Sequence, residues 1–249
     1  MRRVCLTVHA ERLHEDPVWR AVERLLDRLE RRSGHATFLV SPLRASAAGV
    51  ELGGRLREVV DRGHEVGQHT HYYPLTVAPG GRITFEKRAD ASPENLRRCL
   101  DHDYARLLSA GVHPRGFVSG AWAVHDEVVD WLLEHGFEYD LSFRRFPLGY
   151  HSAAAARGAG CDTPFVHRGL LAIPTTNSLA RAVRDEIVGR REPPRIGGLP
   201  YDVIYVHDYD LTDVRRRVLL ATLDRAVGAA ARVTVSELKT LVAAGLVAA

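Results

Sequence analysis

The chain has 249 residues, of which 45% are hydrophobic, so one large α/β domain is as plausible as two small ones. A formal net charge of only +3, with acidic and basic residues alternating along the chain, argues against a nucleic-acid partner. No stretch approaches the roughly 18 apolar residues of a membrane span, and the N-terminus has no signal-like apolar core, so we expect a cytoplasmic protein without membrane contact.

The first third of the chain alternates apolar runs with amphipathic segments. A β-branched run at 4–8 predicts a buried strand. Asp16 and Pro17 then give an N-cap and a first-turn proline, and the apolar residues after them recur at helical spacing as far as Gly34. The next segments predict a strand at 36–41, a helix at 49–63 and a strand beginning at 64.

The later segments continue this alternation around two irregular stretches. Residues 75–90 are polar and contain Pro79-Gly80-Gly81, which predicts a loop or hairpin insertion, and residues 147–169 are rich in Ala and Gly. The remaining sequence predicts strands at 116–120, 139–143, 169–176, 202–210 and 231–236, and helices at 92–111, 125–136, 178–190, 213–229 and 237–246.

Repeated strand-then-helix units predict a parallel sheet with helices outside it. At least six such units fit, which favours a (β/α) barrel in one domain over residues 1–249. Active sites of such barrels lie at the C-terminal ends of the strands. Polar residues directly after each apolar run are therefore the candidates for a functional site: His9, Glu11, His69, Thr70, His71, Tyr73, Trp122, His125, Thr175, Thr176, Asn177, His207, Asp208 and Asp210.

Two groups of these residues suggest specific chemistry. His69 and His71 share one face of a continuing strand, and Glu11 would add a carboxylate; this donor set suits Zn²⁺ or Fe²⁺ with an open position for water. His207 ends a strong strand and is placed to act as a general acid. A strand-capping role for His207 and a core role for Trp122 stay open as alternatives.

Several motifs follow one another in the order and spacing of a known family: LTVHAE, SGHATFLVSP, GHEVGQHTH, PRGFVSGAW, EHGFEYDLSF, LLAIPTT and YVHDYDL. The sequence resembles the polysaccharide deacetylases, the family 4 carbohydrate esterases, from about Val4 to the VTVSEL segment. The resemblance implies an irregular (β/α) barrel of about seven strands. It also implies a divalent metal that polarises an acetamide carbonyl, a carboxylate base and a histidine acid.

The resemblance assigns roles to three positions. His69 matches the first metal histidine of the family, His207 matches the histidine acid, and Asp140 matches an aspartate with a structural or orienting role. Other positions depart from the family pattern. The segment His9-Ala10-Glu11 stands where two acidic residues are usual, Tyr73 stands at the usual second metal histidine, and Val118 replaces an arginine.

The sequence therefore predicts a metal-dependent hydrolase that removes an N-acetyl or similar acyl group from a small amino-sugar-type substrate or a related amide. In this prediction Glu11, His69 and His71 hold a divalent metal, with zinc expected, His9 is the base and His207 is the acid. Trp122, Tyr73, Asp208 and Asp210 would contact the substrate. The alternatives are a catalytically inactive protein that binds a saccharide or a partner, and a hydrolase of non-sugar amides on the same scaffold.

Overall fold

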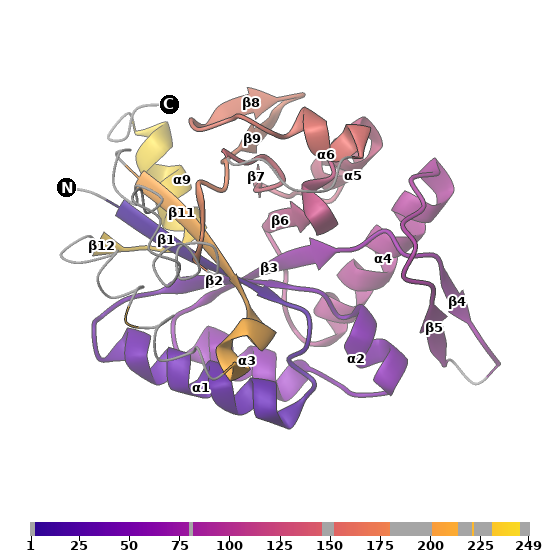
Figure 1. Cartoon of the computed structure of the whole chain (residues 1–249), viewed down its shortest axis with the longest axis horizontal. Coiled ribbons are helices and arrows are strands. Elements are labelled where there is room, and N and C mark those ends of the chain that lie inside the picture. The colour runs from indigo at the N-terminus through magenta and orange to yellow at the C-terminus, as the bar shows by residue number, and fades with distance from the viewer. Residues whose placement is uncertain are drawn as a thin grey trace.

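The computed structural model describes residues 3–79, 82–145, 152–179, 201–213, 221 and 231–244. One curled sheet forms the centre of the molecule, with neighbouring strands in the order β10-β11-β1-β2-β3-β6-β7-β9-β8 and β12 paired to β1 (Figure 1). The strands of this sheet are β1 (Arg3–Ala10), β2 (Ala36–Val40), β3 (Glu65–Thr70), β6 (Gly116–Ser119), β7 (Tyr139–Asp140), β8 (Phe165–His167), β9 (Leu170–Ala172), β10 (Asn177–Ser178), β11 (Tyr201–His207) and β12 (Ala231–Arg232).

Alternate residues of β1 face two different apolar layers. Val4, Leu6 and Val8 pack in one cluster with buried residues of α1 (Asp16–Glu30) and α3 (Gly53–Asp61). Cys5, on the opposite face, belongs to a second cluster with Leu238 of α9 (Val235–Ala243). Because side chains alternate along a strand, His9 projects on the Cys5 face, toward the inside of the curled sheet.

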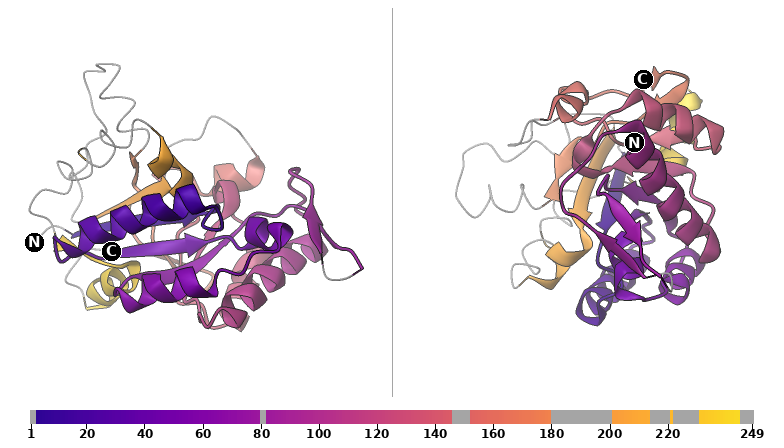
Figure 2. Two further views of the ribbon diagram at one scale, coloured as in Figure 1. Left: turned by 90° about the horizontal axis from the view of Figure 1, so that it is seen from below. Right: turned by 90° about the vertical axis from the view of Figure 1, so that its right-hand side faces the viewer.

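The other helices surround this sheet. They are α2 (Leu43–Ala48), α4 (Pro93–Ser109), α5 (Asp126–Glu134) and α6 (Ala153–Arg157), with the short 3₁₀ helices η1 (Gly120–Trp122) and η2 (Asp208–Thr212). Figure 1 shows α1 and α3 on one side of the sheet and α9 on the other. The antiparallel hairpin of β4 (Leu75–Val77) and β5 (Ile83–Phe85) projects from the body of the molecule (Figure 2).

The predicted fold class is confirmed. The strands β11, β1, β2, β3, β6, β7 and β9 are successive neighbours and all parallel. The short strands β10 and β8 extend this series at its two ends, β8 in antiparallel orientation, and β12 pairs with β1 outside the series. The result is a half-barrel with α1 and α3 on its outer face, as the alternation of strands and helices predicted, whereas α9 packs on the Cys5 face. Among the described residues, no helix combines the length and apolar character needed to cross a bilayer.

Some element bounds differ from those predicted. The helix predicted at 49–63 starts only at Gly53, because Gly49 adopts φ +68° and ends a separate helix, α2. Residues 75–90 contain the β4–β5 hairpin, and the irregular stretch predicted at 147–169 includes α6 and β8. Ser178, the first residue of the helix predicted at 178–190, belongs to β10 instead, and that helix beyond Leu179 lies outside the described residues, as does almost all of the one at 213–229.

Candidate functional site

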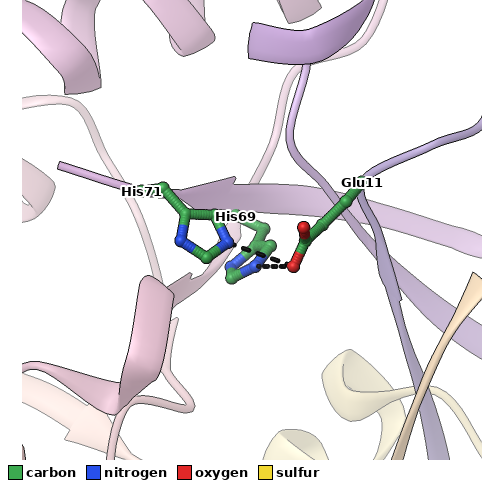
Figure 3. Close-up of side chains that lie close together, drawn as sticks. All are labelled: Glu11, His69 and His71. Carbon is green, nitrogen blue, oxygen red and sulfur yellow. Dashed lines mark hydrogen bonds and ion pairs between the residues drawn. The ribbon is translucent and has the colours of Figure 1, made fainter. Parts of the chain in front are cut away.

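Three potential metal ligands converge at the C-terminal ends of β1 and β3. Glu11 directly follows β1, His69 is the second-last residue of β3, and His71 directly follows that strand. Glu11 Oε1 lies 3.1 Å from His71 Nε2 and 3.6 Å from His69 Nε2 (Figure 3). Ligand atoms of all three residues lie within 4.8 Å of one another. Tetrahedral zinc sites separate their ligand atoms by about 3.3 Å, so these three residues could hold a metal.

A hydrogen bond from His69 to the backbone determines which of its ring nitrogens can bind a metal. His69 Nδ1 lies 3.0 Å from the carbonyl oxygen of Val118, the residue opposite it in β6. A carbonyl oxygen only accepts, so Nδ1 carries the proton, and in the neutral ring Nε2 presents a lone pair toward Glu11. A lone pair facing a carboxylate is unfavourable unless a cation lies between them. The donor set therefore fits a divalent metal.

Electrostatics keep Glu11 in its ligand form. Burial raises the pKa of the Glu11 carboxyl, but the neighbouring His69 and His71 side chains outweigh burial and hold this pKa well below its usual range. Arg44 Nε, 3.7 Å from Glu11 Oε2, adds a positive charge on the outer side. Burial lowers the pKa of His71, which favours the neutral ring that metals bind.

His9 lies directly behind this group. Its ring centroid is 5.0 Å from that of His69 and 5.6 Å from that of His207, and the side chain is 2% exposed. Burial lowers the pKa of His9 far below its usual value, and the neighbouring imidazoles lower it further. Nε2 of His9 is buried without a hydrogen-bond partner in the described part of the chain. His9 is thus a neutral imidazole with a free ring nitrogen beside the candidate metal ligands.

His207 reaches the same group from β11. It stands opposite His9 in the parallel register of β1 and β11. Its Nε2 lies 3.9 Å from Glu11 Oε1, while its Nδ1 lies 3.3 Å from Asp210 Oδ2. The Asp210 carboxylate also accepts the backbone N–H of His207, at 3.1 Å. Asp210 therefore orients the His207 ring so that Nε2 faces the centre of the site.

Comparison with solved structures shows what this arrangement resembles. A polysaccharide deacetylase-like protein from Mycobacterium smegmatis superposes with a TM-score of 0.62 at 19% identity, over 98% of this chain and 91% of the other. The chain has the fold of the family 4 carbohydrate esterases. A peptidoglycan deacetylase from Bacillus subtilis matches with a TM-score of 0.53 at 16% identity, over 98% and 93% of the two chains.

The fold alone does not decide activity. A family 4 pseudoenzyme from Bacillus anthracis also superposes, with a TM-score of 0.53 at 14% identity over 95% of this chain and 65% of the other, and a mutant of that protein has restored enzymatic activity. No protein-family model and no curated protein matches the sequence. The resemblance read from the motifs is therefore confirmed as a likeness of fold.

Two predicted substrate contacts lie inside this deacetylase fold. Trp122 is 4% exposed and packs in the core against Tyr205, with ring centroids 4.7 Å apart. Asp208 is fully buried and accepts the backbone N–H of Arg12 at 2.7 Å, and burial raises its pKa to about 7. Both side chains are buried: the Trp122 ring also lies 5.3 Å from that of His9, and Asp208 ties η2 to the residues after β1.

The other candidates differ in position. Tyr73 is half-buried and stacks on the ring of His71, with centroids 5.1 Å apart, so it lies beside the site while His71 contacts Glu11. Thr175, Thr176 and Asn177 are buried; Thr176 bonds to Asp202 and Val203. The structure thus brings together Glu11, His69, His71, His9 and His207. Thr175, Thr176 and Asn177 are instead buried, and Thr176 is hydrogen-bonded within the sheet.

Sequence reasoning missed a cavity of about 830 Å³ beside His71. Four segments that are far apart in the sequence form it, and only their small side chains indicate it in the sequence. The described lining consists of His71, Tyr72, Tyr73, Ala89, Asp90, Ala91, Gly120, Ala121, Ala123, Val124, His125, Ser152, Ala153, Ala154 and Arg157.

Proposed function

We propose that the protein is a metal-dependent amide hydrolase that removes an N-acetyl or similar acyl group from a small amino-sugar-type or related amide. The observation that carries this proposal is the convergence of Glu11, His69 and His71 with two further imidazoles at one end of a deacetylase-like sheet. A divalent cation, zinc in this proposal, would supply Lewis acidity toward the amide carbonyl and toward the attacking water.

His9 is the proposed base. Its neutral ring has an unpaired Nε2 within the site, so it can accept the proton that water loses as the new C–O bond forms. Its low pKa keeps the base form fully populated at neutral pH, although it also limits the driving force for proton transfer.

His207 is the proposed acid. The amide nitrogen needs a proton as the C–N bond breaks, and His207 Nε2 faces the centre of the site with Asp210 behind the ring. The Asp210 carboxylate holds the ring in the orientation from which a protonated His207 can donate. The products are a carboxylic acid and a free amine.

Substitutions at His9 and Glu11 distinguish the proposed base, His9, from the proposed metal ligand, Glu11. We expect His9→Ala to retain metal and to lose turnover by about 10²-fold or more, because only the base is removed. Glu11→Ala should lose metal as well as turnover. Metal content after dialysis, measured by mass spectrometry, and amine release are the two readouts, with exposed His113→Ala as control. Metal loss in His9→Ala with retention in Glu11→Ala would reverse the assignment.

A catalytically inactive binding protein is the second candidate. It is favoured by His9, which stands where the resembling family has an acidic residue, and by the likeness to a pseudoenzyme fold. Saccharide binding without amine release from any acylated amine, in protein shown to hold metal, would support this candidate over the hydrolase.

A further inference from the structure

The cavity beside the candidate metal centre shares a wall with it. His71 contacts Glu11 through Nε2, and the same ring lines the cavity of about 830 Å³. Cavities of roughly 300–1,000 Å³ enclose drug-sized ligands, so this space is far larger than an acetyl group requires. A group bound here would therefore lie next to whatever reacts at the metal centre, with His71 between them.

The surface of the cavity is mainly apolar. Ala121 and Ala123 come from the segment after β6, Ala153 and Ala154 from α6, and Tyr73 forms an aromatic wall. Tyr73 is held between His71 and Phe85, its ring stacked on both, with centroids 5.1 Å and 6.0 Å away. The β4–β5 hairpin therefore supports this wall through Phe85.

Most polar side chains of the lining are already engaged within the protein. Tyr72 OH accepts a hydrogen bond from Ser119 Oγ at 2.9 Å. Ser152 Oγ accepts the N–H of Ala155 at 3.0 Å, as the cap of α6.

The charged groups at the edge of the cavity are paired as well. Arg157 binds Asp126 at 2.6 Å, and Asp90 accepts from the backbone and hydroxyl of Ser92. A sugar ring would bring several hydroxyls into a space with few free partners, at a cost for each unpaired group. An apolar ligand has no such cost.

We propose that this cavity binds the acyl group of the substrate amide and that this group is a medium-length aliphatic chain, represented here by octanoyl. The proposal rests on the function proposed above, because it places the carbonyl at the metal centre and the chain beyond His71. Each buried methylene is worth roughly a fourfold gain in affinity, so chain length should dominate recognition.

Calorimetry with the carboxylate products tests this directly. We expect the zinc-loaded 249-residue chain to bind octanoate at least about tenfold more tightly than acetate, with a more negative heat-capacity change, the marker of apolar burial. Ala154→Leu fills the cavity and should weaken octanoate binding while leaving acetate binding unchanged. Ala153→Leu, at a more exposed position of the same wall, repeats the test should the first variant fold poorly.

The matched control is Ala156→Leu. Ala156 lies in the same helix, α6, but is exposed and does not line the cavity, so its substitution should leave octanoate binding unchanged. Equal affinity for octanoate and acetate would overturn the proposal. So would octanoate binding that neither cavity variant weakens.

Amide substrates separate failure of this inference from failure of the proposed function. Hydrolysis of N-acetylglucosamine but not N-octanoylglucosamine would overturn the acyl-chain proposal and leave the hydrolase proposal standing. Faster hydrolysis of N-acetyloctylamine than of N-octanoylglucosamine would assign the cavity to the amine side and also overturn it. Chain-length-dependent octanoate binding without hydrolysis of any amide would contradict the proposed function while supporting the ligand class.

Discussion

His71 can reach Glu11 only because residue 120 has no side chain. A Cβ atom added at Gly120 would lie 2.5 Å from His71 Nδ1 and 3.0 Å from its Cα. The first distance is shorter than real Cβ contacts and the second is tighter than most of them, and the backbone of His71 cannot move as freely as a flexible side chain. Gly120 therefore positions a candidate ligand without touching the metal centre itself.

Gly120→Ala should consequently weaken metal binding. We expect a loss of roughly 10- to 100-fold in zinc affinity, the effect typical of displacing a group that orients a metal ligand. Competition with a chromophoric chelator measures it. Gly54→Ala is the matched control, because a Cβ there meets nothing within 4 Å. Unchanged affinity in Gly120→Ala would show that His71 is not a ligand.

Individual site residues were predictable to different degrees. Glu11, His69 and His71 lie at or directly after predicted strands. The rule that active sites lie at the C-terminal ends of parallel strands was therefore enough to predict them. The role of the Val118 carbonyl was not predictable, because it depends on the register between β3 and β6. The burial of Trp122 and Asp208 likewise follows from packing between segments far apart in the sequence.

At the scale of elements, His64 joins the end of α3 to the start of β2. Its Nδ1 accepts the N–H of Ala36 at 3.1 Å, and burial lowers its pKa to about 4. The unfolded value is about 6.5, so between pH 4 and 6.5 the unfolded chain binds a proton that the folded chain does not. The free energy of unfolding therefore falls as pH drops through this window, by up to about 1.4 kcal/mol per pH unit.

His64→Gln should flatten this dependence. A glutamine oxygen can accept the same N–H but does not titrate. Urea denaturation at pH 7 and pH 5 compares the two proteins, and we expect a smaller loss of stability in the variant. His113→Gln, at an exposed position, serves as control. An identical loss in wild type and His64→Gln would rule out His64 as a source of the acid sensitivity.

Glu65 links three strands to the last helix. Its carboxylate accepts from Thr37 Oγ1 at 2.8 Å, from Tyr139 OH at 2.9 Å, and from the backbone and hydroxyl of Ser236 at the start of α9. Glu65→Ala leaves these donors without a partner, and we expect a loss of roughly 2–3 kcal/mol in denaturant unfolding. Glu51→Ala, which removes an exposed ion pair with Arg106, should cost under about 1 kcal/mol. Similar losses in both variants would contradict this role.

Element types were more predictable than element ends. The apolar stripe of α1 is buried as its spacing indicated. The sequence did not predict the division between α2 and α3. The predicted helix begins at Gly49, whereas the positive φ of this glycine ends α2. From the sequence alone, a single glycine can lie within a helix or end one, and only the packing of the neighbouring residues decides between the two.

At the scale of the whole molecule, the site depends on the curled parallel sheet. His9 and His207 are opposite each other in β1 and β11, and His69 lies two strands away in β3. Residues separated by more than a hundred positions thus meet only when the sheet is complete. Metal binding should therefore report on, and add to, the stability of the folded chain.

Zinc should raise the melting temperature of the wild type. At a free concentration about 100 times its dissociation constant, a ligand that binds only the folded chain adds about 2.7 kcal/mol. For a chain of this size that corresponds to roughly 5–10 °C. Scanning calorimetry with and without zinc measures the shift, and a shift of equal size in His69→Ala would show that zinc binds elsewhere.

The metal content of the purified protein is the most direct test of the proposed centre. After incubation with zinc and dialysis, we expect mass spectrometry to find close to one zinc per wild-type chain and none in His69→Ala, with circular dichroism showing that both are folded. Wild-type protein that holds no zinc or other divalent metal while correctly folded would contradict a metal centre at Glu11, His69 and His71, and with it the hydrolase.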